Sequence, residues 1–204
     1  MEREAVRAIA ETRAWVERAV IGLNLCPFAR AVQAKGLVRY AVSDARDADG
    51  VLAALRVEMA ALAVADPAEL DTTILILTGA FADFADYNDF LDPAEAALAD
   101  AGLDGVLQIA SFHPHYRFAG TAEGDLANAT NRSPWPLLHL LREASVDRAV
   151  AAFPGAEAIY ERNIATLQAL GADGWAALQA RCRADADRAE AGFRPSPDAR
   201  RAGA

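Results

Sequence analysis

The sequence QIASFHPHYRFAGTAEGDLANATNRSPWPLLHLLR, residues Gln108–Arg142, contains all three histidines of the chain. Across Val106–Phe112 the residues alternate as in a strand, where every second side chain lies on the same face. If the alternation continues, His113 and His115 project from one face. Pro114 between them lacks a backbone N–H and favours extended geometry before it. The stretch therefore predicts the exposed end of a strand that presents two imidazoles together.

Two other stretches also have strand character. Leu37–Val42 alternates, and Thr72–Leu77 is a continuous β-branched run, which is typical of a strand covered on both faces. Helical patterns over Asp47–Val64 and Pro93–Ala101 separate the strands. The chain therefore predicts an α/β (or α+β) fold, with a sheet of three or more strands built from β-α-β-α-β and covered by helices. Crossovers of this length suit parallel strands, although an antiparallel or ferredoxin-type split arrangement is an alternative.

Further helices are expected at both ends of the chain. An apolar stripe over Glu2–Ile21 predicts an N-terminal helix, and Glu157–Leu170 and Asp173–Ala189 predict two C-terminal ones. We expect residues 1–192 to form a single globular domain. The tail 193–204 has two prolines, three arginines and few apolar residues, and this composition predicts disorder.

Composition limits the classes of partner. The 204 residues are 53% hydrophobic and 24% charged, which allows a sizeable core. A net charge of −9 argues against nucleic acid or an anionic membrane as the main partner. The chain has no uncharged apolar window of about 18 residues, and its N-terminus is charged, unlike a signal peptide. Two cysteines are too few for a disulfide framework, so we expect a cytoplasmic protein.

The histidine pair suggests a metal site. A His-x-His sequence at a strand end offers two nitrogens to a metal, and a third ligand could come from Cys26 or Asp89. Zinc suits a set of cysteine and histidine, whereas iron suits two histidines with a carboxylate. Cys26 follows the N-terminal helix and precedes a proline, an unusual place for a cysteine needed only for packing. The simpler interpretation is that both histidines are hydrogen-bonded where a strand passes into a loop.

A second pattern suggests an anion-binding half of the same site. Ser133 and a following proline precede a leucine-rich run, which predicts a helix with Ser133 as its N-cap. Free N–H groups at a helix start, with the guanidinium of Arg132, could bind a carboxylate or phosphate. Asn131, and Asn88 in an expected loop over Phe81–Asp92, are further candidates for substrate binding. The alternative is an ordinary capped helix with a solvated arginine.

His139 and Cys182 have more ordinary interpretations. His139 would lie on the helix that is expected after Ser133, as a structural or supporting residue rather than a ligand. Cys182 falls on an apolar helical stripe with Trp175 and Leu178, which indicates a small core residue.

Several phrases carry a family resemblance: GLNLCPFA (Gly22–Ala29), DYNDFL (Asp86–Leu91), SFHPHYRFAGT (Ser111–Thr121), NRSPWPLLHLLRE (Asn131–Glu143) and ERNIATL (Glu161–Leu167). In this order they resemble the bacterial family catalogued as domain of unknown function 1415. The resemblance extends from about Trp15 to Leu170. It implies no catalytic assignment, because the family has no established activity.

Together these patterns favour a metal-dependent enzyme, a hydrolase or an oxidoreductase, that acts on a small anionic substrate. In this hypothesis the catalytic residues are Cys26, Asp89, His113 and His115, and Arg132 holds the substrate. A second hypothesis is a metal-free enzyme with Cys26 as nucleophile and a histidine as base. A third is a haem-binding module, because Cys26 precedes a proline as in haem-regulatory dipeptides, and a fourth is a structural protein. The sequence does not specify an oligomeric state.

Overall fold

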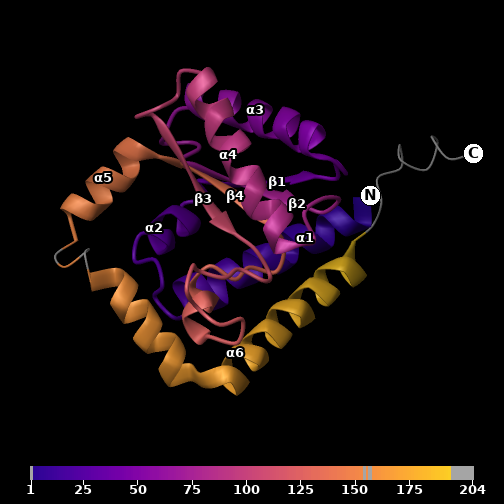
Figure 1. Cartoon of the computed structure of the whole chain (residues 1–204), viewed down its shortest axis with the longest axis vertical. Coiled ribbons are helices and arrows are strands. Elements are labelled where there is room, and N and C mark those ends of the chain that lie inside the picture. Colours follow the sequence, from indigo (N-terminus) through magenta and orange to yellow (C-terminus); the bar gives the residue numbers. More distant parts are fainter. Residues whose placement is uncertain (1, 154, 156–157, 194–204) are drawn as a thin grey trace, which may run out of the picture.

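The computed structural model describes residues 2–153, 155 and 158–193. These residues form a four-stranded sheet with helices on both faces (Figure 1). The strands are β1 (Val38–Ser43), β2 (Thr72–Leu77), β3 (Leu107–Phe112) and β4 (Leu137–Arg142). The helices are α1 (Glu2–Trp15), the π-helical η1 (Val16–Ile21), α2 (Ala29–Ala34), α3 (Ala48–Val64), α4 (Phe84–Asp100), the 3₁₀-helical η2 (Leu126–Thr130), α5 (Glu143–Ala151) and α6 (Ile159–Gly192). The predicted α/β class and all three predicted strands are confirmed. The predicted disordered tail was 193–204, and residues 194–204 lie outside the described part of the chain.

The strands lie in the order β1-β2-β4-β3. β1 and β2 pair in parallel, and β4 runs antiparallel to both of its neighbours, β2 and β3. β1, β2 and β3 therefore point in the same direction, as expected, and their carboxyl ends meet at one edge of the sheet. The fourth strand was not predicted, and it separates β2 from β3.

β4 corrects the predicted helix after Ser133. Leu138 and Leu140 face the core on one side of the sheet, whereas Leu137 faces the core on the other. A strand between two others buries both faces, so it loses the alternation of polar and apolar residues and its apolar run resembles that of a buried helix. The helix start at Ser133, and the helical placement of His139, were therefore wrong.

α4 corrects the predicted loop over Phe81–Asp92. The helix begins at Phe84 because the Asp83 carboxylate accepts hydrogen bonds from the amides of Ala85 (2.7 Å) and Asp86 (3.3 Å). Pro93, which was expected to begin the helix, lies inside it. Its lost hydrogen bond is offset by the buried face of the helix, which includes Tyr87, Phe90, Ala94, Ala97 and Leu98.

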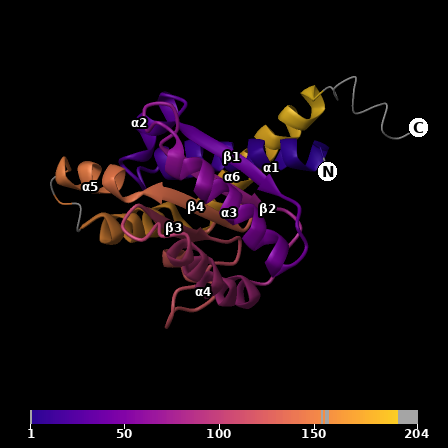
Figure 2. The same ribbon diagram turned by 90° about the horizontal axis from the view of Figure 1, so that it is seen from above.

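Two hydrophobic cores lie on opposite faces of the sheet. α3 and α4 pack on one face, against Leu75, Leu77, Leu107, Leu138 and Leu140. α1, η1 and α6 contribute to the other core, with Ile74, Ile76 and Leu137. Figure 2 shows α4 and α1 on opposite sides of the sheet. The two predicted C-terminal helices are the two halves of α6, separated as expected at Gly171, whose backbone is not helical (φ 72°, ψ 170°). The second half lies beside α1 (Figure 1).

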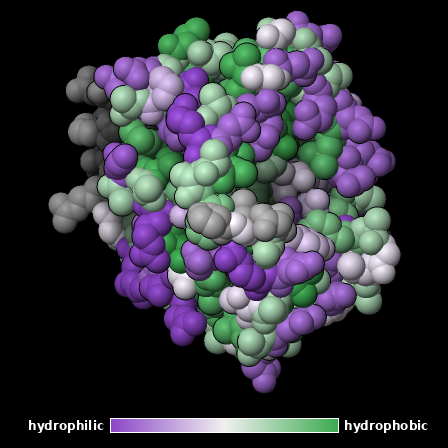
Figure 3. All heavy atoms as spheres, turned by 90° about the vertical axis from the view of Figure 1, so that its left-hand side faces the viewer, coloured by the Kyte–Doolittle hydropathy of each residue, from purple (hydrophilic) through white to green (hydrophobic). Residues whose placement is uncertain are grey.

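One face of the sheet is less completely covered over β3 and β4. On that face Gln108 is exposed, and Ala110 and His139 are only partly buried. Figure 3 looks onto the side of the molecule where α2 and α5 lie, and it shows apolar side chains reaching the surface among hydrophilic ones. Within the described residues, no helix has an apolar stretch sufficient to cross a bilayer.

Candidate functional site

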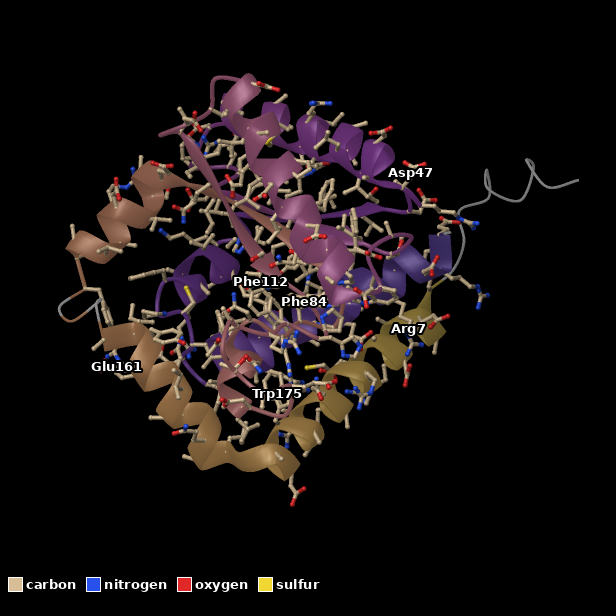
Figure 4. All side chains as sticks on the ribbon, viewed as in Figure 1. Arg7, Asp47, Phe84, Phe112, Glu161 and Trp175 are labelled. Atoms are coloured by element: carbon tan, nitrogen blue, oxygen red, sulfur yellow. The ribbon has the colours of Figure 1, made fainter. Side chains whose placement is uncertain are left out.

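The loops that follow β1, β2 and β3 all leave the carboxyl edge of the sheet. This edge of a sheet with parallel strands is where ligands commonly bind. Figure 4 marks Asp47 at the start of α3, Phe84 at the start of α4 and Phe112 at the end of β3. Each of these three residues therefore marks a loop that reaches the carboxyl edge.

His113 is fully buried, and both of its ring nitrogens have protein partners. Nδ1 accepts a hydrogen bond from the His115 amide (3.0 Å), so the ring proton lies on Nε2, which donates to the carbonyl of Phe81 (2.9 Å). Burial lowers the pKa of His113, which favours the neutral ring. A metal ion could bind this imidazole only by displacing one of these two hydrogen bonds.

His115 is exposed, and its ring centroid lies 5.9 Å from that of His113. β3 ends at Phe112, so the two histidines belong to a turn and not to a continued strand. The expected proximity of the rings is therefore present, with a different local geometry. Of the three histidines, His113 and His139 make ring hydrogen bonds. Within the described residues, the His115 ring makes none.

Asn131 and Arg132 lie beside this turn. The side-chain amide of Asn131 donates to the Ser111 carbonyl (3.1 Å), and the backbone carbonyl of Asn131 accepts from the His113 amide (3.2 Å). Arg132 donates from Nε to the Tyr116 carbonyl (3.2 Å) and from Nη2 to the Glu123 carbonyl. Burial lowers the pKa of Arg132. These groups connect neighbouring loops, so anion binding by Arg132 stays a prediction and would compete with these carbonyls.

Ser133 is buried, and its hydroxyl donates to the Trp135 carbonyl (2.5 Å) instead of capping a helix. Asn88 and Asp89 are exposed on α4. The structure thus brings together four of the predicted residues, His113, His115, Asn131 and Arg132. Among residues 2–153, 155 and 158–193, no three His, Cys, Asp or Glu side chains form a group that could hold a metal ion.

Cys26 lies in the loop between η1 and α2. The amides of Phe28 and Ala29 donate toward its sulfur, but burial is the larger effect and raises the pKa of the thiol. Asn163 on α6 ties the loop down by donating to the Leu25 carbonyl (2.7 Å). None of the hydrogen bonds in the described part of the chain joins Cys26 to a histidine, so the cysteine and the histidine turn have separate local partners.

His139 has a structural role within the sheet. The Thr72 hydroxyl donates to the Leu140 carbonyl (2.5 Å), so its oxygen accepts from Nε2 of His139 (2.7 Å). Burial lowers the pKa of His139 to about 4. The interpretation of His139 as structural agrees with these contacts. Cys182 is buried in the core beside α1, as predicted.

A cavity of about 450 Å³ lies where β1 and β2 end, and sequence reasoning did not single out its residues. It is lined by Glu4, Asp44, Arg46, Thr78 and Gly79. A smaller cavity of about 220 Å³ is lined by residues of α2, by Leu37 before β1 and by Asp71 before β2, and so lies toward the opposite edge. The larger one is at the edge where parallel strands place ligands. Apart from Glu4, which lies on α1, its residues follow two predicted strands, and this position was the signal that could have identified them.

The loops after β1 and β2 approach each other closely at this cavity. The Thr78 amide donates to the Ser43 carbonyl (2.9 Å). A Cβ atom on Gly79 would lie 2.4 Å from the Asp44 carbonyl oxygen, so only glycine fits there. The cavity lining carries two carboxylates, Glu4 and Asp44, and one guanidinium, Arg46. The lining therefore combines groups that attract cations with one that binds anions.

The chain belongs to the family described as "Protein of unknown function (DUF1415)", whose sequence profile matches residues 7–177. This match confirms the resemblance found in the sequence. The curated proteins and the solved structures give no match to the chain.

Proposed function

We propose that this protein is an enzyme that binds a small substrate with an anionic group in the cavity where β1 and β2 end. The observation that carries the proposal is the location of Arg46 and Asp44 in a cavity of about 450 Å³ at the carboxyl ends of two parallel strands. The loops there are anchored by the sheet and can vary without disturbing the core. The volume is large enough for a small metabolite, in a half-open site where Glu4, Asp44, Arg46 and Gly79 are all exposed to solvent.

The charges of the lining favour a substrate that carries both signs. Arg46 can donate two parallel hydrogen bonds to a carboxylate or phosphate. Asp44 and Glu4 can accept hydrogen bonds from an ammonium group. With two carboxylates and one guanidinium the lining has a net charge of −1, and the whole chain has a net charge of −9. A molecule with one anionic and one amino group matches this lining better than a multiply charged anion.

The residues of the cavity supply acid–base chemistry. Asp44 can accept a proton from a bound substrate, and Arg46 can stabilise negative charge that develops on it. The raised pKa of Cys26 disfavours the alternative of a cysteine nucleophile, because the thiolate is the reactive form. A cytoplasmic location belongs to the same proposal and is compatible with free Cys26 and Cys182.

Calorimetric titration tests the binding site. The probes are glycine, β-alanine and 4-aminobutyrate, compared with acetate, propanoate, butyrate and inorganic phosphate. We expect at least one amino acid to bind, and Arg46→Ala to weaken that binding about ten- to hundred-fold, since a charge-assisted hydrogen bond contributes about 1.5–3 kcal/mol. Arg56→Ala, an exposed change on α3 outside the cavity lining, is the matched control. Equal binding by the Arg46 and Arg56 variants would show that the cavity is not the site.

The metal-dependent hypothesis makes a different prediction, and the proximity of the two rings at 5.9 Å favours it. If zinc or iron binds at this turn, elemental analysis of the purified protein should find about one equivalent. His115→Ala should then remove that metal, because His115 is the exposed member of the pair. If the cavity is the ligand site instead, His115→Ala leaves amino acid binding unchanged.

A further inference from the structure

The buried imidazole of His113 joins the end of β3 to the loop that lines the cavity. We infer that His113 is a positioning residue for the ligand site: its Nε2–H holds the Phe81 carbonyl and thereby fixes the segment Thr78–Phe81. The inference rests on the proposed function for the ligand, whereas the position of the segment can be tested without one. Nothing in this role requires His113 to contact substrate.

The backbone conformation of Phe81 shows why the hydrogen bond from His113 is needed. Phe81 has φ 60°, in the left-handed region that bulky residues rarely adopt. A residue in this conformation persists only where the surrounding structure fixes it, and such residues are frequent at functional sites. Three contacts fix this one. The Phe81 ring packs against the rings of Phe90 (centroids 4.5 Å apart) and Tyr87 (6.3 Å), and the carbonyl accepts the hydrogen bond from His113 (2.9 Å).

His113 itself is rigidly held. Its ring lies against the rings of Phe84 (5.4 Å) and Tyr87 (5.1 Å) on α4. The Tyr87 hydroxyl donates to the Leu137 carbonyl of β4 (2.6 Å) and accepts from the Phe112 amide of β3 (3.2 Å). The His115 amide occupies Nδ1, so the ring can present only Nε2–H to Phe81. The imidazole is therefore fixed by α4, β3 and β4 in one orientation and one tautomer.

The hydrogen bond from His113 is only two residues away from the cavity lining. Phe81 lies two residues after Gly79, which lines the cavity and must fit against the Asp44 carbonyl. A displaced Phe81 carbonyl would allow the Thr78–Phe81 segment to move away from the loop that carries Arg46. The predicted histidine site and the cavity are therefore connected. His113 holds the segment Thr78–Phe81, and Thr78 and Gly79 of this segment line the cavity.

Two substitutions separate the hydrogen bonds of His113. In His113→Gln the side-chain N–H₂ can reach the Phe81 carbonyl as Nε2 does, but the acceptor for the His115 amide is lost. In His113→Asn the side-chain oxygen replaces Nδ1 as that acceptor, but the donor to Phe81 is lost. Both variants remove the imidazole from the same buried position. A purely structural role predicts similar behaviour for the two.

The measurement is amide hydrogen exchange and chemical shift by NMR in the free protein, together with titration of glycine and β-alanine. We expect faster exchange of the Thr78 amide, which donates to the Ser43 carbonyl, and shifted amides at Gly79–Phe81 in His113→Asn only, with near wild-type values in His113→Gln. For a probe that binds the wild type, affinity should fall about tenfold or more in the Asn variant and be rescued in the Gln variant. Equal amide changes in both variants would overturn the inference. If the amides respond as expected and neither probe binds the wild type, the positioning of the segment stands and the proposed function fails.

Discussion

Protonation of His139 would place a charge inside the sheet, between β2 and β3. Its pKa is lowered from 6.5 to about 4 by burial, so the folded protein holds the neutral ring. Between these two pH values the unfolded chain binds more protons, and folding stability therefore decreases as pH falls through this window. The side chain is only partly buried by surface area, so the loss from this one group is at most about 3 kcal/mol when the window has been crossed.

The substitution His139→Gln isolates this effect. Glutamine does not titrate but can still donate to Thr72, which accepts from Nε2 in the wild type. We expect the wild type to be the more stable at pH 7, and its advantage over the variant to shrink as pH falls from 6.5 to 4. Urea unfolding of both proteins across this range measures the difference. A difference that is constant with pH would mean that His139 titrates normally in the folded protein.

Arg132 is predicted to stabilise the loops that follow β3. Arg132→Ala removes its hydrogen bonds to the Tyr116 and Glu123 carbonyls, so we expect a loss of about 1–3 kcal/mol in unfolding free energy. The affinity for glycine or β-alanine should be unchanged, because Arg132 is not in the cavity lining. Thermal melts combined with titrations check both parts. Unchanged stability with weaker binding would instead support the anion-binding role predicted from the sequence.

Among the helices and strands, α4 is unusual because Pro93 lies within it although proline cannot complete the helical hydrogen bonds. Pro93→Ala restores an N–H that can bond to the carbonyl four residues earlier. The helical gain is about 3 kcal/mol, and the greater freedom of the unfolded chain removes about 0.4–1 kcal/mol of it. We therefore expect a net stabilisation of about 2 kcal/mol in denaturant unfolding. Asp92→Ala, at the preceding exposed position, should change stability by less than about 0.5 kcal/mol. A destabilised Pro93→Ala would show that the proline suits this helix better than alanine does.

The elements that the sequence predicted well carry a clear local signal, either β-branched residues that favour a strand or a capping residue at a helix start. Thr72–Leu77 is a strand over the predicted residues, and Asp47 caps α3 by accepting from the Gly50 amide (2.8 Å). The two failures have different physical origins. The β4 run is apolar on both faces and has no period that distinguishes strand from helix. α4 begins before its proline, because Asp83 and the buried face of the helix outweigh a local signal that normally marks a helix start.

Across the molecule as a whole, the predicted histidine turn lies at the carboxyl edge of the sheet, and its role there stays a prediction. His113, His115, Asn131 and Arg132 are together at the carboxyl edge. Sequence spacing cannot show that both nitrogens of His113 are used by the Phe81 carbonyl and the His115 amide. The cavity could not be found from spacing either, because it depends on how two loops, one after β1 and one after β2, approach each other in space.

The proposed ligand site is the cavity where β1 and β2 end, which the His113 turn supports and does not form. An amide NMR titration of the wild-type protein with glycine and β-alanine tests the location of the site directly, because each shifted amide identifies a residue near the bound ligand. We expect the largest shifts at Asp44–Asp47 and Thr78–Ala80, with small ones at His113–His115 and at Cys26. Shifts concentrated at the histidine turn or at Cys26, with Asp44–Asp47 and Thr78–Ala80 unaffected, would contradict it.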